Sequence, residues 1–211
     1  MSLRGSRNKP TAGGDLPESK TENVPEAEKR HQKKPFLTPY ELATFAVLGA
    51  LMYCSKIIME WAPNIHLLGM FTMTFALAYK AKGLIPLYVY VFLNGLFAGF
   101  AFWWIPYLYI WTILWGVTVL LPKKLPVPLS AFMYSLVCGL HGLLFGVMYA
   151  PVQALFFGFD FDQTLAWIAS GLPFDVVHAL GNFAAGFLIM PLVKVIGKIN
   201  VNIRRGRAEF K

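Results

Sequence analysis

Charged residues are scarce in this chain of 211 residues: Asp, Glu, Lys and Arg make up 14% of it, and hydrophobic residues make up 56%. Soluble domains carry about a quarter charged residues, so the composition excludes an ordinary soluble protein. The sequence also lacks the strict alternation of apolar and polar residues that the strands of an outer-membrane barrel need. The apolar runs that follow Thr38 therefore predict an all-α integral membrane protein.

The chain has only two cysteines, and it lacks the motifs of several enzyme classes. Cys54 and Cys138 lie in apolar runs, without the spacing of a disulfide framework or a metal site. The sequence contains no GxxxxGK[ST] loop, which excludes ATP hydrolysis through a P-loop, and no HExxH pair. His66, His141 and His178 lie in three different predicted elements and could still converge on one ion. We expect no catalytic residue, no metal and no cofactor.

The two ends of the chain differ from the part between them. Residues 1–35 are hydrophilic, with eight Lys or Arg and five Asp or Glu. Such a segment cannot bury a core, so we expect a disordered basic cytoplasmic tail. Residues 36–199 form the predicted membrane domain, and residues 200–211 a second short basic tail. The membrane domain begins with TPYE, in which Thr38 can cap a helix, Pro39 suits its first position and Glu41 completes a capping box.

Turn and charge signals divide the membrane domain into six apolar segments. The interrupting stretches include WAPNIH, KAKG, WWIP and PKKLPVP. The predicted transmembrane helices cover residues 38–60, 65–79, 84–102, 106–121, 128–150 and 172–193. We expect the stretch at 163–170, QTLAWIAS, to form an interfacial helix. The sequence thus predicts a bundle of six transmembrane helices with both termini on the same side.

Lys and Arg are missing from three of the predicted loops, at residues 61–64, 103–105 and 157–170. Of the nineteen Lys and Arg residues, all but Lys56 lie in the tails or flank the other side of the membrane. The positive-inside rule then places both termini in the cytoplasm. The net charge of +8 is explained by this topology, and we expect a lipid bilayer rather than nucleic acid as its partner.

Three polar residues lie in the last apolar segment, which begins GLPFDVVHALGN. On a helix, Asp175, His178 and Asn182 fall within about 60° of one another. Ionisable groups inside a membrane are costly and usually functional. The stripe either contacts a ligand or only joins the last span to its neighbours through hydrogen bonds.

Other polar residues, and many aromatic ones, lie near the predicted outer ends of the spans. Lys56 and Glu60 are four residues apart and can pair on one helix face. The aromatic rings form either an interfacial belt or part of a cavity that stacks a flat ligand. The candidate substrate-binding residues are Lys56, Glu60, Asn64, His66, Trp111, Gln153, Asp175, His178 and Asn182.

Small residues recur at helical spacing in three of the predicted spans. One face of the first span carries Ala43, Ala46, Ala50 and Cys54, and its core reads AVLGA. Small residues allow helix backbones to approach closely in a membrane. The stretches GLFAG at 95–99 and GLLFG at 142–146 are typical of ordinary packing within a bundle, whereas the stripe of the first span either packs internally or docks on another protein.

The six-span layout, the AVLGA stretch and the ending GLPFDVVHALGNFAAGFLIMPLVKVIGK together resemble the substrate-binding S components of energy-coupling factor (ECF) transporters, over about residues 38–197. This resemblance implies capture of a vitamin or its precursor from outside a bacterial plasma membrane, in a site formed by the first outer loop and helices four to six. It implies that Ala43, Ala46 and Ala50 dock on a transmembrane T component, and that two cytoplasmic ATPases drive the cycle. The long N-terminal tail departs from the compact family pattern.

Two other classes stay open. A self-sufficient secondary transporter would need coupling ions and inverted repeats, and no convincing repeat relates the first three spans to the last three. A membrane enzyme or an assembly factor is the other class. The sequence does not identify the ligand, although its many aromatic residues favour a heterocycle; Lys56 could face a carboxylate or phosphate, and Asp175 an amine.

Overall fold

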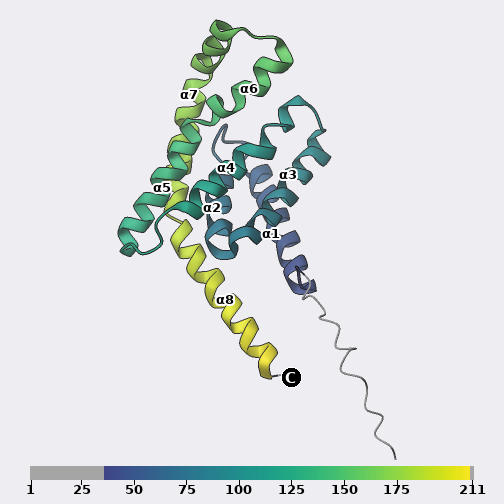
Figure 1. Cartoon of the computed structure of the whole chain (residues 1–211), viewed down its shortest axis with the longest axis vertical. Helices are drawn as coiled ribbons and strands as arrows, with labels where there is room; N and C mark the ends of the chain where they lie inside the picture. Colours follow the sequence, from purple (N-terminus) through teal and green to yellow (C-terminus); the bar gives the residue numbers. More distant parts are fainter. Residues whose placement is uncertain (1–35, 210–211) are drawn as a thin grey trace, which may run out of the picture. The chain divides into compact units, whose positions relative to one another are not determined.

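The computed structural model describes residues 36–209, and the predicted tail at 1–35 lies outside this range. The unit that begins at Leu37 is all-α in its described part, as predicted (Figure 1). Its 3-10 turns are η2 (Lys80–Gly83) and η3 (Phe102–Trp104). Its helices are α1 (Pro39–Ile58), α2 (Leu68–Tyr79), α3 (Leu84–Ala98), α4 (Tyr107–Leu120), α5 (Val127–Leu143), α6 (Phe145–Phe157), α7 (Phe161–Gly186) and α8 (Ile189–Glu209).

Several helical segments are long and apolar enough to cross a membrane. Within the described residues there are four, or five if the pair α7 and α8, which is bent by 45°, forms one span. The four are Pro39–Ile58, Leu68–Ala98, Phe102–Leu120 and Val127–Phe157. The chain is therefore a multi-pass helical membrane protein. The predicted second and third spans count as one segment here because η2 joins α2 to α3 without a break.

The chain nevertheless reverses direction at η2. Phe45 near the start of α1 packs against Tyr79 at the end of α2, with ring centroids 5.0 Å apart, so these helices are antiparallel. Tyr53 near the end of α1 stacks on Phe97 near the end of α3 at 5.2 Å, so these two are parallel. Lys80 adopts a φ of +55° at the reversal. Helices α2 and α3 thus run in opposite directions, as separate second and third spans would.

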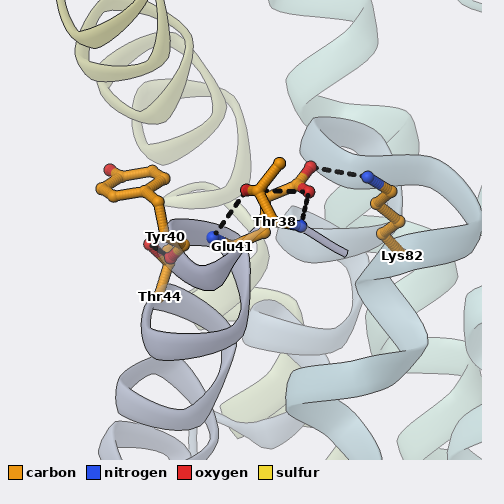
Figure 2. Close-up of polar contacts among 5 residues, drawn as sticks. All are labelled: Thr38, Tyr40, Glu41, Thr44 and Lys82. Carbon is orange, nitrogen blue, oxygen red and sulfur yellow. Dashed lines mark hydrogen bonds and ion pairs between the residues drawn. The ribbon is translucent and has the colours of Figure 1, made fainter. Parts of the chain in front are cut away.

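The capping box predicted at the start of α1 is present (Figure 2). The backbone N–H of Glu41 donates to Oγ1 of Thr38 at 3.2 Å, and that of Thr38 donates to Oε2 of Glu41 at 3.0 Å. Lys82 donates to the other carboxylate oxygen at 2.6 Å. The indole N–H of Trp115 in α4 donates to the carbonyl of Lys80 at 3.0 Å. The start of α1, the η2 turn and the end of α4 therefore meet at one end of the unit.

Because the basic turns meet at one end of the unit, they predict the orientation of the chain in the membrane, and this orientation can be measured. A reporter fused after Lys124, in the loop that follows α4, is expected to be cytoplasmic, because that loop leaves the same end as η2. A reporter fused after Phe159, between α6 and α7, is expected to lie outside. Activity of paired reporters that work on opposite sides of the membrane checks this, and the reverse result at both positions would contradict the orientation.

Helices α5 and α7 lie side by side and approach closely at small residues (Figure 1). At Gly142, a Cβ atom would lie 3.0 Å from the Cα atom of Ala179, and at Gly186 it would collide with the backbone of Ser135. In the other glycine motif, Gly95 lies against aromatic rings of the following loop. These glycines permit internal helix packing, which in a membrane relies on close contact rather than on a hydrophobic drive.

We expect Gly186→Val to destabilise the fold strongly, because the added side chain would push α7 away from α5. The cost should reach at least about 2 kcal/mol, within the range for an overpacked core. Gly171→Val on the same helix is the matched control, since a Cβ there meets no atom within 4 Å. Thermal unfolding in detergent measures both, and equal losses would show that the α5–α7 crossing is not tight.

The helix boundaries differ from the prediction at four points. Helix α7 includes the stretch expected to form an interfacial helix, because Asp160 and Gln163 form a capping box that starts it early. The predicted fifth span extends through a break at Leu144 into α6. The predicted last span is divided by a bend between Gly186 and Ile189, and α8 continues helically into the residues expected to form the C-terminal tail.

The core lies where α2, α3, α4 and α5 face one another, and α1, α7 and α8 each add a residue to it. It is built from aromatic and long aliphatic side chains, and polar groups are set among them. Residues exposed by 1% or less include Met52, Phe75, Leu87, Tyr90, Trp111 and Leu114. Trp111 links this core to the candidate site described next.

Candidate functional site

A cavity of about 230 Å³ lies at the end of α1 that is remote from Glu41. The end of α1, the loop at 59–67, the starts of α4 and α6 and the middle of α7 form its walls. Because α1 has 20 residues, the cavity lies about 30 Å from the basic turns. Six of the nine residues that the sequence predicts for a ligand site line it: Lys56, Glu60, Asn64, His66, Asp175 and His178.

The other three predicted residues lie outside the cavity lining. Trp111 is 1% exposed, and its ring lies 5.8 Å from that of His66, behind the cavity wall. Asn182 is 1% exposed, one turn further along α7 than His178. Gln153 is half-buried in α6 and does not contribute to the lining. Ligand binding by all nine residues stays a prediction.

At the rim of the cavity, Lys56 and Glu60 form the ion pair that their spacing predicts, with Nζ and Oε1 2.9 Å apart. Their side chains are 26% and 56% exposed. A pair this accessible contributes little to stability, at most about 1 kcal/mol. Either partner can therefore exchange the other for a charged group on a ligand at small cost.

Rings at the inner wall of the cavity pack edge to face on one another, and further rings lie behind them. The His66 and His178 rings lie 4.5 Å apart, Phe145 lies 5.0 Å from His178, and Trp111 lies 5.5 Å from His141. His66 is outside the helices, in the loop that precedes α2, and burial lowers its pKa from the ordinary value to about 4. His66 is therefore neutral at pH 7 and can both donate and accept a hydrogen bond.

Several polar atoms of this ring cluster have no hydrogen-bond partner among residues 36–203. They are Nδ1 of His66, Nε1 of Trp111, Nδ1 of His141, Nε2 of His178 and both amide atoms of Asn182. Buried polar groups are nearly always paired, and an unpaired one costs about 1–3 kcal/mol. The cluster therefore offers donors and acceptors to a polar ligand, next to rings that can stack on a flat one.

Asp175 has a partner that sequence reasoning did not find. Its Oδ2 accepts a hydrogen bond from the backbone N–H of Gly146 at 3.1 Å, and the residue is 8% exposed. Phe145, which lines the cavity, was also missed, because the GLLFG pattern draws attention to its glycines rather than to the aromatic residue between them. Its place at the outer end of a predicted span, among other aromatic residues, is the signal that could have found it.

A second cavity, of about 420 Å³, lies at the opposite end of α1 and is lined by Glu41, Lys82 and Asn200 among others. Its charged groups are paired with each other, and Thr38 also bonds to Glu41. Unlike the first cavity, it is not lined by the unpaired buried atoms described above. The first cavity is therefore the better candidate for a ligand site.

Although three histidines lie near Trp111, no group of three or more His, Cys, Asp or Glu in the described part of the chain is arranged to hold a metal ion. The chain matches no protein-family model, no curated protein and no solved structure. The fold and the site define a class of protein. It is a multi-pass helical membrane protein that has, at one end, a small cavity lined by aromatic and polar groups.

Proposed function

We propose that this chain is the substrate-binding S component of an ECF-type importer in a bacterial plasma membrane. It captures a small micronutrient, a vitamin or a vitamin precursor, from outside the cell. The observation that carries this proposal is the cavity, which unites six polar residues from α1, the following loop and α7. The resemblance noted in the sequence implies a binding site in the first outer loop and helices four to six, and the loop and α7 are among these elements.

The position of the cavity supports uptake from outside. The basic turns meet at the far end of the unit, and Lys and Arg concentrate on the cytoplasmic side of membrane proteins. With that end in the cytoplasm, the cavity opens toward the exterior. A solute that reaches it does so without first crossing the bilayer.

The lining of the cavity suggests the chemistry of the solute. The His66, His178 and Phe145 rings suit stacking against a flat heterocycle, whose ring atoms would pair with the histidine nitrogens. Lys56 at the rim suits a carboxylate or a phosphate. A heterocycle that carries an acidic group therefore fits the site best.

The surface of α1 supports docking on a T component. Phe45, Gly49 and Met52 are buried and face the bundle, whereas Ala43 and Ala46 are exposed on another face. Ala50, further along that face, is half-buried. Small side chains there permit a second membrane protein to approach closely. Two cytoplasmic ATPases would supply the energy, so the chain itself acts as no enzyme and needs no cofactor.

Purification of the tagged full-length protein from its native membranes tests this proposal. We expect a transmembrane T component and two ATPases to copurify, and mass spectrometry of the bands to identify them. Uptake by the protein alone in liposomes, driven by an ion gradient, would show a secondary transporter instead. Turnover of a substrate without partners or a gradient would show an enzyme.

A further inference from the structure

Helices α5 and α6 are separated by one residue, Leu144, whose φ of −89° and ψ of 5° interrupt the helical path. Gly146 lies in the first turn of α6, where backbone N–H groups lack partners within the helix. Asp175 on α7 accepts the hydrogen bond from this N–H group at 3.1 Å. A carboxylate is favourable at such a position, because it meets both a free donor and the positive end of the helix dipole.

This contact needs a glycine in α6. A Cβ atom at position 146 would collide with the carboxylate of Asp175, so any side chain there would displace that carboxylate and break the hydrogen bond. In the described part of the chain, the hydrogen bond between Gly146 and Asp175 joins α6 to α7. The side-chain hydrogen bonds that connect α6 to other elements are made with Tyr109 on α4 and Trp103 in η3. Asp175 therefore fixes how the start of α6 lies against α7.

The residue next to Gly146 is Phe145, which is half-buried and lines the cavity. Its ring centroid lies 5.0 Å from that of His178 and 5.8 Å from that of Trp111. Both of those rings carry an unpaired nitrogen, and both are at most 3% exposed. The ring of Phe145 thus covers polar groups that a ligand in the cavity would need to reach.

We propose that Asp175 is a positioning residue of the binding site: by holding Gly146 it fixes the break between α5 and α6 and keeps the Phe145 ring over His178 and Trp111. Access from the cavity to the unpaired nitrogens of these two rings then depends on one hydrogen bond. The inference rests on the proposed function only in that it treats the cavity as a binding site. It gives Asp175 a different role from a charge that contacts the ligand directly.

The two roles make different demands on the side chain. Asp175→Asn keeps an oxygen that can accept from Gly146 but loses the charge, whereas Asp175→Ala loses both. A positioning role therefore predicts that Asn preserves the position of Phe145 and that Ala does not. Val147→Ala is the matched control, because Val147 is also in the first turns of α6 but is 45% exposed.

The position of the ring can be observed directly in the full-length protein without a ligand. With 4-fluorophenylalanine incorporated at position 145, we expect one fluorine resonance in the otherwise wild-type protein, and the same resonance in Asp175→Asn and Val147→Ala. In Asp175→Ala we expect a shifted or second resonance. An unchanged spectrum in Asp175→Ala, or an equal change in Asp175→Asn, would overturn the proposal.

Access is measured with the native thiol of Cys138, which is fully buried beside Asn182. In a Cys54→Ala background, a charged methanethiosulfonate added from outside should label Cys138 about tenfold faster when Asp175→Ala is present. That factor corresponds to the loss of a hydrogen bond to a charged group. Adding Phe145→Ala to Asp175→Ala should increase the rate no further, since both changes open the same path.

An unchanged labelling rate in Asp175→Ala, or fully additive effects in the double variant, would show that the ring does not control access. Thermal unfolding of each variant separates a local change from general loss of the fold. Neither readout requires a ligand. Failure to find any bound solute would therefore refute the proposed function without affecting the positioning role of Asp175. Conversely, a bound solute together with an unchanged spectrum and labelling rate in Asp175→Ala would refute the positioning role alone.

Discussion

Replacement of Ala46 by tryptophan is expected to abolish ATP-driven uptake while the isolated protein still binds its solute. Ala46 is exposed on α1, away from the buried face that Phe45 and Gly49 form. An indole ring there would hold a partner helix several ångströms away and remove the close contacts on which association in a membrane depends. Uptake of labelled solute into cells, together with binding by the purified variant, measures the two activities separately.

Leu51→Trp is the matched control for this experiment. Leu51 is 48% exposed on the same helix but lies outside the alanine stripe. We expect it to retain uptake, and we expect Ala50→Trp to lose it as Ala46→Trp does. Full uptake by both alanine variants would show that the stripe faces lipid and that docking occurs elsewhere.

The second large effect is expected at the inner wall of the cavity. His178→Ala removes both a ring of the cavity wall and a nitrogen that has no partner among the described residues. Loss of such a contact should weaken binding by roughly ten- to a hundredfold, since a buried hydrogen bond that is lost costs about 1–3 kcal/mol. Titration of the purified protein in detergent, with its melting temperature as the folding control, measures this change.

Ser170→Ala on the same helix should leave the affinity unchanged. Ser170 is exposed, and its hydroxyl donates only to the carbonyl of Trp167 within the helix, at 2.8 Å. Wild-type affinity in His178→Ala, with the fold intact, would exclude His178 from the binding site. It would leave the polar stripe of α7 with a role in helix packing alone.

Features that depend on residues close in the sequence could be predicted. Two such features are the capping box of Thr38 and Glu41 and the ion pair of Lys56 and Glu60. Each connects positions three or four apart, so the geometry of a single helix determines it. The all-α class followed from the apolar runs in the same way. The shared face of Asp175 and His178 also follows from helical geometry, and both side chains line the cavity.

Features that depend on distant contacts could not be predicted. The sequence suggested an amine on a ligand as the partner of Asp175, but in the structure the backbone N–H of Gly146 donates to its carboxylate. That contact depends on the break at Leu144, and the GLLFG stretch around this residue is as typical of close helix packing as of a helix end. The early start of α7 has a local signal, the capping pair of Asp160 and Gln163, but the resulting helix of 26 residues is longer than one span requires.

Mass spectrometry of small molecules released from the purified protein shows whether the cavity captures a substrate. We expect the wild-type protein, purified from cells grown in rich medium, to release one compound in near-stoichiometric amount, and we expect this compound to be a small heterocycle. The same preparation of His178→Ala, with an unchanged melting temperature, should release much less of it. Absence of any compound from the wild-type protein, or equal amounts from both proteins, would contradict the assignment of this cavity as the site of substrate capture.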